Sequence, residues 1–263
     1  MKKDAAIIQK RDLQPHTKGD NRMYYLLRTL KAEQLKLKKS PVWLAFLVLP
    51  VISAFFGTGN YLMNQEVLKS EWFSLWSQHS LFLCFIFMPA LIGTFCSYLW
   101  RLEHMRNNWN SFLTAPVPLS CLYLGKLFQA VRMVLLGNIW IFFLYFLCGK
   151  LCGLSSSLPP KVLEWFLCGL LGGNVICCVQ LAISMVIRSF AVPIGIGLAG
   201  GIGGLLIVNK GLGSWYPYSL YSLGMRANNP QMEIDIKVFA ASCILYFLLF
   251  SALSVALLRR HEQ

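Results

Sequence analysis

The sequence predicts an all-α polytopic membrane protein with six transmembrane helices, an N-terminal interfacial amphipathic helix and short re-entrant outer helices before the last span. Composition is the first reason. The chain of 263 residues is 56% hydrophobic and only 13% charged, with a mean hydropathy of +0.56. This is more apolar than soluble globular domains are. The second reason is a series of long windows without charge, most of which reach the roughly 20 residues that cross hydrocarbon as a helix.

The charge-free windows place the spans. We expect them at about 41–63, 81–100, 124–148, 163–187, 192–208 and 238–258. The third span reaches the necessary length only if Arg132 extends its guanidinium to the membrane interface, as long cationic side chains do.

The distribution of positive charge predicts the orientation. With both termini in the cytoplasm, eighteen of the 24 Lys and Arg residues fall on the inner side. The positive-inside rule therefore favours cytoplasmic termini. The net charge of +13 has a nucleic-acid interpretation, but the excess lies in the N-terminal segment and the inner loops. Contact with anionic lipid explains it more simply.

The N-terminal region divides in two. Residues 1–21 lack periodicity and are expected to form a polar cytoplasmic tail, followed by a single transmembrane domain over 22–263. Within that domain, residues 22–39 place apolar side chains on one helical face and basic side chains off it, which is typical of a helix in the inner membrane interface. An ordinary soluble amphipathic helix is the alternative. Ser40 and Pro41 suit the N-cap and first position of the next helix.

The fifth span is rich in glycine. Glycines spaced as small-x-x-x-small pairs let a neighbouring helix approach to backbone distance in lipid. We therefore expect a packing face toward other spans or toward a second membrane subunit, made by Gly197, Gly200, Gly201 and Gly204.

The longest outer loop, 210–237, carries a cluster of aromatic residues. Such residues anchor a protein at the membrane interface, and the prolines and glycines among them suggest short broken helices. Simple anchoring and a lid or exit lining for an amphipathic substrate both remain open for Trp215, Tyr216, Pro217, Tyr218 and Tyr221.

Several chemistries have no motif in this chain. All eleven acidic residues lie outside the charge-free windows, which argues against proton or sodium coupling. No P-loop, H-E-x-x-H or G-x-S-x-G motif occurs, so we expect no catalytic residue, no metal site and no cofactor here. The nine cysteines show no C-x-x-C spacing and are interpreted as small hydrophobes.

The loop between the second and third spans is the remaining candidate site. Its polar and aromatic residues are compatible with a short helix that ends at Pro116 and enters a groove of a cytoplasmic partner. A membrane-surface turn is the alternative. The candidate contact residues are Glu103, His104, Arg106, Trp109, Phe112 and Leu113.

Three stretches resemble a known family. They are LKAEQLKLKKS before the first span, NWNSFLTAPVPLSCLYLGK before the third, and the region from IRSFAVPIGIGLAGGIGGLL to YPYSLYSLGMRANNP. Together they are similar to the permeases of type-2 ABC exporters, and among these to the small permeases of bacteriocin or lantibiotic immunity and antimicrobial-peptide resistance. The order of Glu103, the apolar segment 109–113, the stop at 114–118 and Gly125-Lys126 follows the family pattern. The segment 105–108 departs from it, because it is basic and amide-rich.

The resemblance implies a multi-pass permease in a bacterial plasma membrane, which exports an amphipathic peptide and works with a second permease or a second copy of itself. ATP and Mg would be bound by a separate ATP-binding subunit, and the loop after Glu103 would be the coupling helix. Two alternatives remain: the same architecture with a lipid, polysaccharide or drug as substrate, and a non-transporting immunity protein. An enzyme is disfavoured because no acid, base and nucleophile converge.

Overall fold

The computed structural model describes residues 18–38, 40–105 and 117–262. Over these ranges every regular element is a helix, and six helical runs are long and apolar enough to cross a membrane. The predicted fold class is therefore confirmed. The elements are α2 (Lys18–Leu37), α3 (Val42–Met63), α4 (Glu71–Phe82), the π-helical turn η1 (Leu83–Phe87), α5 (Met88–His104), α7 (Leu119–Leu151), α8 (Val162–Val186), α9 (Ala191–Asn209), the 3₁₀ turn η3 (Gly213–Trp215), α10 (Ser219–Gly224) and α11 (Ile236–Glu262).

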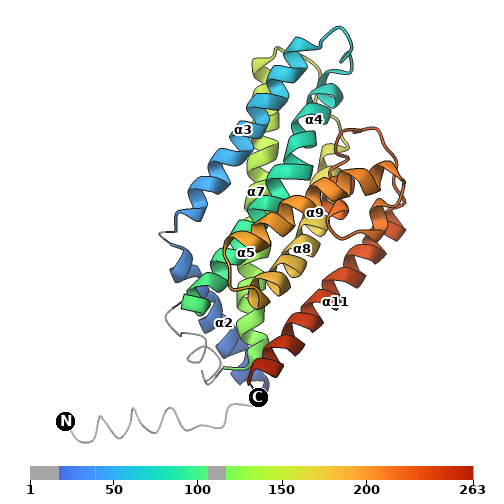
Figure 1. Cartoon of the computed structure of the whole chain (residues 1–263). Coiled ribbons are helices and arrows are strands. Elements are labelled where there is room, and N and C mark those ends of the chain that lie inside the picture. The colour runs from blue at the N-terminus through green and yellow to red at the C-terminus, as the bar shows by residue number, and fades with distance from the viewer. Residues whose placement is uncertain (1–17, 39, 106–116, 263) are drawn as a thin grey trace, which may run out of the picture.

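Successive spans run in opposite directions along the bundle. As a result α2, the beginning of α7 and the end of α11 lie together at one end, which we call the terminal end (Figure 1). The connection between α9 and α11 lies at the other side of the membrane body, below the upper ends of α3 and α4 in this view. α2 and the last described turn of α11 thus lie on the same side of the six spans.

The centre of the bundle is formed by the α4–α5 run and α8. In each of them 67% of the most apolar window is buried, against 28% in α9 and 22% in α11. The last two helices therefore leave most of their apolar side chains at the outer surface. That surface is suited to lipid or to another subunit.

The second span is longer than predicted. A continuous helical run covers residues 71–104, whereas the predicted span begins at 81. The added turns carry Trp72 and Trp76, both buried. The Tyr145 hydroxyl donates to the Trp72 carbonyl oxygen over 2.7 Å, and the Trp76 indole stacks on that of Trp165 with centroids 5.6 Å apart. Aromatic packing against α7 and α8 accompanies the extension of the helix before the predicted start.

The third span also exceeds its expected bounds of 124–148. α7 has 33 residues and is about 50 Å long at 1.5 Å per residue, while the hydrocarbon layer is about 30 Å thick. Near the terminal end of α7, Lys126 lies alongside α2 and α5, where its charge is compensated by protein groups rather than by lipid.

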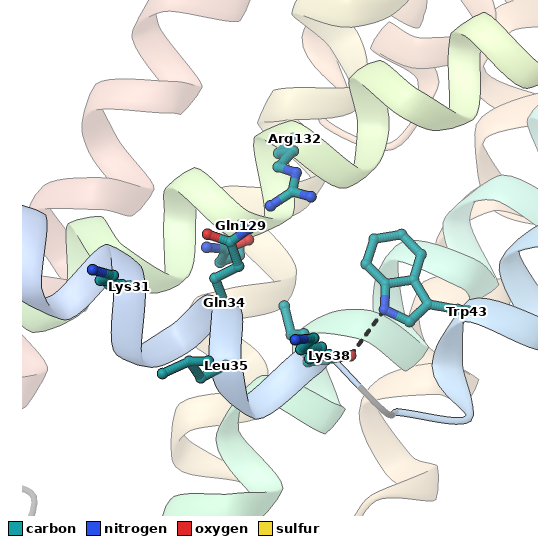
Figure 2. Close-up of a pocket in the computed structure, with 8 residues that line it drawn as sticks. Lys31, Gln34, Leu35, Lys38, Trp43, Gln129 and Arg132 are labelled. Atoms are coloured by element: carbon teal, nitrogen blue, oxygen red, sulfur yellow. Dashed lines mark hydrogen bonds between the residues drawn. The ribbon is translucent and has the colours of Figure 1, made fainter.

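The face of α2 that packs against the bundle carries both polar and apolar side chains. Thr29, Glu33 and Leu37, spaced four apart, are buried, whereas Met23 and Leu27 are 60% and 58% exposed. The apolar face inferred from the sequence is thus divided, because Leu37 packs into the bundle whereas Met23 and Leu27 point away from it. Trp43, just inside α3, donates its indole N–H to the Leu37 carbonyl over 2.9 Å and braces the link between α2 and α3 (Figure 2).

The glycines of α9 lie where this helix meets its neighbours. A Cβ on Gly201 would be 2.4 Å from the carbonyl oxygen of Phe85 in η1, and one on Gly197 would be 2.7 Å from that of Pro89. On the adjacent side a Cβ on Gly200 would be 2.8 Å from the Tyr218 ring, and one on Gly204 would be 3.4 Å from Ser219. Only hydrogen fits at the first three positions.

Candidate coupling site

The terminal ends of α2, α5 and α7 meet around a cluster of four charged residues, Glu33, Lys36, Glu103 and Lys126, which we call the charge cluster. Close backbone approach makes this meeting point. A Cβ on Gly125 would lie 2.6 Å from Cγ2 of Thr29, so α7 reaches α2 only because the residue before Lys126 has no side chain.

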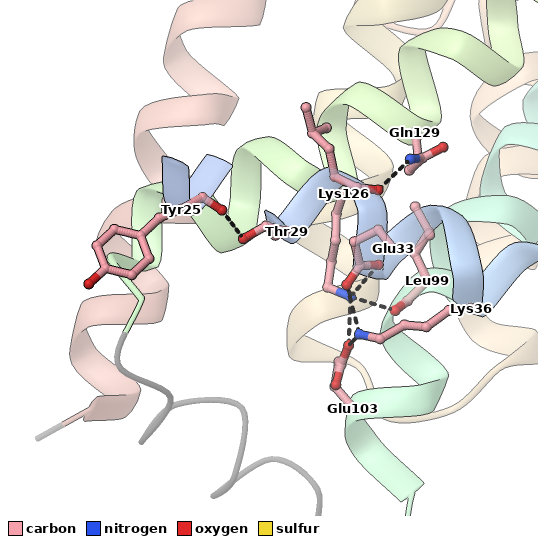
Figure 3. Close-up of polar contacts among 9 residues, drawn as sticks. Tyr25, Thr29, Glu33, Lys36, Leu99, Glu103, Lys126 and Gln129 are labelled. Carbon is pink, nitrogen blue, oxygen red and sulfur yellow. Dashed lines mark hydrogen bonds and ion pairs between the residues drawn. The ribbon is translucent and has the colours of Figure 1, made fainter. Parts of the chain in front are cut away.

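Lys126 occupies the middle of the charge cluster (Figure 3). Its side chain is fully buried, and Nζ donates to Glu103 Oε1 over 2.9 Å and to Glu33 Oε2 over 3.2 Å. Nζ also donates to the Leu99 carbonyl oxygen over 2.9 Å and lies 4.9 Å from the centroid of the Trp100 ring. A buried ammonium requires such compensation, since an unpaired one would be costly.

Lys36 closes the charge cluster on its outer side. Its Nζ donates to Glu33 Oε1 over 2.7 Å and to Glu103 Oε1 over 2.6 Å, so that Glu103 accepts from lysines of two different helices. Two carboxylates and two ammonium groups give no formal net charge. The Glu103 carboxylate also lies at the C-terminal end of α5, where the helix dipole disfavours an anion, and the two lysines offset that cost.

The charge cluster alters the protonation of Lys36, the member of it with the most solvent contact. Burial lowers the pKa of the Lys36 ammonium, but the carboxylates of Glu33 and Glu103 raise it by more, and the pKa lies above the ordinary lysine value. Lys36 therefore remains charged at any pH at which the protein operates.

The charge cluster includes residues close to both ends of the segment that connects α5 to α7. Glu103 lies three residues before position 106, and Lys126 ten residues after position 116. The predicted contact residues Arg106, Trp109, Phe112 and Leu113 lie outside the described residues. The structure thus places Glu103 in an internal ion-pair cluster, and its contact with a partner stays a prediction.

His104 connects the same end of α5 to a fourth helix. Its Nε2 lies 3.2 Å from the carbonyl oxygen of Ser184 in the last turn of α8, and its ring is 6.4 Å from that of Trp100. The end of α5 therefore contacts α2, α7 and α8. A displacement of the segment after α5 would therefore act on α2, α7 and α8.

Sequence reasoning did not identify Glu33, Lys36 and Lys126 as members of one site. Two features of the sequence are related to the charge cluster. Thr29, Glu33 and Leu37 recur every fourth residue on one face of α2, and Gly125-Lys126 puts a cation next to the smallest residue in the first turns of a span. Both signals indicate a helix that packs through charge, yet neither specifies which carboxylate meets which lysine.

The predicted outer residues lie in two environments. Trp215 is 67% exposed, whereas Tyr218 and Tyr221 are buried. The Tyr218 hydroxyl accepts from Gln180 Nε2 over 2.9 Å, and the Tyr221 hydroxyl donates to Asn138 Oδ1 over 3.0 Å. The two buried tyrosines fix α10 to α8 and α7. Among the five predicted outer residues, only Trp215 and the half-buried Tyr216 and Pro217 are accessible from outside the protein.

Arg226 secures the end of the same loop. Its buried guanidinium pairs with Glu164 of α8 and donates to the carbonyl oxygens of Leu223 and Gly224. Backbone φ at Arg226 is +51°, a conformation that a non-glycine residue adopts at a cost. The ion pair and the two hydrogen bonds offset this cost and hold the segment against the bundle.

Comparison with known proteins places the chain in a family. Residues 29–204, about two thirds of the 263 residues, match the family described as ABC-2 family transporter protein. A comparison with curated proteins gives no match. The match runs from within α2 to within α9 and includes every residue of the charge cluster. The chain belongs to the ABC-2 family of transporter proteins and is a multi-pass permease subunit of an ABC transporter, a class that works with an ATP-binding partner.

Proposed function

We propose that this permease exports an amphipathic antimicrobial peptide, in the manner of a lantibiotic immunity or resistance transporter, with ATP and Mg bound by a separate subunit. The terminal end would face the cytoplasm of a bacterial cell, with α2 in the inner membrane interface and residues 22–263 acting as one permease domain. The exposed Met23 and Leu27 of α2 support the interfacial position.

The observation that carries the coupling part of the proposal is the pairing of Glu103 with Lys126. Residues 106–116 lie between these two residues in the sequence. If a partner subunit holds the loop, its movement on ATP binding pulls on the end of α5, and the charge cluster passes the displacement to α2 and α7. Such a transmission needs a contiguous physical connection, which the ion pairs provide.

The surface of α9 and α11 supports a peptide as cargo. Ile202 and Leu206 on α9, and Ile244, Leu245 and Leu248 on α11, are 46–63% exposed. An amphipathic peptide partitions into the outer leaflet with its apolar face buried. A lateral approach along these helices toward Trp215 suits such a molecule, and a second permease could complete the path.

Affinity purification tests the proposal. The full chain is isolated from native membranes in mild detergent, the co-purifying subunits are identified, and ATP hydrolysis is measured with and without the lantibiotic nisin. We expect an ATP-binding subunit whose hydrolysis rises with nisin. A rise with lipid or polysaccharide instead would reassign the substrate. Protection of cells that persists after deletion of the ATP-binding subunit would identify a non-transporting immunity protein.

A further inference from the structure

A second feature of the terminal end is a pocket of about 410 Å³ between α2 and α7, on the side of α2 away from the charge cluster. Its walls come from the last turns of α2, the first turn of α3 and the middle of α7. The residues that line it are Lys31, Gln34, Leu35, Leu37, Lys38, Trp43, Gln129 and Arg132 (Figure 2). The volume falls within the range of small-molecule sites.

The pocket is strongly positive. Lys31, Lys38 and Arg132 contribute three cations, and none of the lining residues is acidic. Within the part of the chain that the structure describes, these three side chains make no ion pair. Glu33, the carboxylate nearest to them along α2, is engaged by Lys36 and Lys126. The pocket therefore has an uncompensated charge that favours an anion.

Amide groups add hydrogen-bonding capacity around the cations. Gln34 extends from α2, and Gln129 extends from α7 on the opposite wall (Figure 2). Gln129 is buried and donates through Nε2 to the Leu30 carbonyl over 3.3 Å, which fixes its position. The Leu37 carbonyl is already engaged by the Trp43 indole, so this acceptor does not compete for the cations.

The position of Arg132 indicates where the anion comes from. Arg132 lies within the apolar span 119–151, at the level where α3 begins with Val42 and Trp43. A guanidinium at this boundary is costly unless an anion pairs with it. Leu35, which shares the pocket, is 66% exposed, as expected for a side chain beside acyl chains. A site for soluble phosphate has no need of such a neighbour.

We propose that this pocket, which we call the basic pocket, binds the phosphoryl headgroup of an anionic phospholipid through Lys31, Lys38 and Arg132. The amides of Gln34 and Gln129 lie beside the phosphoryl oxygens, and the acyl chains leave past Leu35 and Trp43. Basic pockets beside spans are suited to anionic headgroups. Because α2 and α7 form its two walls, bound lipid holds together the helices that the charge cluster also joins. The assignment does not depend on the transported substrate.

The fluorescence of Trp43, which lines the basic pocket, can report lipid binding. The full chain in non-ionic detergent is titrated with dioctanoyl-phosphatidylglycerol, dioctanoyl-phosphatidylcholine and inorganic phosphate while tryptophan emission is recorded. The same titration of Trp43→Phe gives the contribution of the other seven of the chain's eight tryptophans. We expect a saturable change with phosphatidylglycerol that Trp43→Phe lacks, and a much weaker response to phosphatidylcholine.

Variants decide whether the basic pocket is responsible. Lys31→Gln, Lys38→Gln and Arg132→Gln are each expected to weaken phosphatidylglycerol binding about fivefold, the effect of about 1 kcal/mol per cation. The control Arg28→Gln/Arg259→Gln/Arg260→Gln removes three exposed cations of the same end and is expected to leave binding unchanged. If a variant that combines the three pocket substitutions does not fold, the single variants keep the test decisive.

Three results would overturn the proposal. Equal binding of phosphatidylcholine would remove the role of charge. Saturation by inorganic phosphate at the same concentration as phosphatidylglycerol would identify a site for soluble phosphate. Weakening by the control variant as large as that by the pocket variants would show a diffuse electrostatic attraction rather than a site.

Discussion

Lys126 and Glu103 form a buried ion pair of 2.9 Å that joins the two ends of the segment between α5 and α7. The pair links the second span, near its end, to the third span, near its beginning. Glu33 and Lys36 connect the same pair to α2. A rearrangement of the segment is therefore coupled to three helices at once.

Replacement of Lys126 by Met tests the energetic importance of this pair. The variant leaves Glu103 short of one partner and Glu33 with Lys36 alone, and the loss of one member of a buried pair costs about 3–5 kcal/mol. We expect a clearly lower unfolding temperature of the detergent-solubilised chain. Lys126→Met combined with Glu103→Gln should lose less than the sum of the two single changes. Additive losses would show that the two side chains do not interact.

Lys36 predicts a dependence of stability on alkaline pH. Its pKa in the folded chain is raised above the ordinary lysine value of 10.5, so the ammonium stabilises the folded state fully below that value. The contribution is lost as the pH rises through the folded pKa. The difference in unfolding temperature between the wild type and Lys36→Met should be constant from pH 7 to 9.5 and shrink above 10.5. A difference that grows above 10.5 would contradict the assigned ion pairs.

Two glycines of α9 provide a matched comparison. A Cβ on Gly201 would meet the Phe85 carbonyl oxygen at 2.4 Å, whereas one on Gly195 meets nothing within 4 Å. Gly201→Ala should destabilise the chain by about 1–3 kcal/mol through overpacking. Gly195→Ala should be neutral or gain up to about 1 kcal/mol from helix propensity. Thermal unfolding of both variants is the measurement, and equal effects would argue against the close contact of α9 with η1.

Substitutions of Tyr221 and Trp215 should distinguish an effect on stability from an effect on transport. Tyr221→Phe removes the hydrogen bond to Asn138 and should cost about 1–3 kcal/mol, because the amide oxygen stays buried. Trp215 is mostly exposed, so Trp215→Ala should leave stability within about 0.5 kcal/mol yet reduce protection of cells against nisin. Unchanged protection by a normally folded Trp215→Ala would leave the outer aromatic residues as membrane anchors only.

The sequence predicts the fold well because apolar spans impose their own pattern. The six charge-free windows correspond to the six spans, and Ser40 accepts the N–H of Val42 at the start of α3, close to its predicted N-cap position. The ends of the spans were harder to predict. At α4 the helix continues through Glu71 and His79 because Trp72 and Trp76 pack against α7 and α8, and tertiary packing of this kind leaves no hydropathy signal.

The candidate site was predicted only in part, for a physical reason. Glu103 can be recognised as a charged residue at the end of a span, but its partners Lys36 and Lys126 come from 67 residues earlier and 23 residues later in the chain. The contact of Lys126 with Glu33 depends on Gly125 and Thr29 allowing α7 to reach α2. The buried state of Tyr218 likewise depends on Gln180 of α8, and neither relationship follows from periodicity.

The most direct test of the coupling proposal changes the loop itself. Trp109→Ala/Phe112→Ala is compared with Phe55→Ala/Phe56→Ala, which removes two exposed aromatic side chains from α3. Both variants are expressed with the ATP-binding subunit, and nisin-stimulated ATP hydrolysis is measured in the purified complexes. The account predicts that the loop variant loses the stimulation, or fails to retain the subunit, while the α3 variant keeps both. Full stimulation in the loop variant would contradict it.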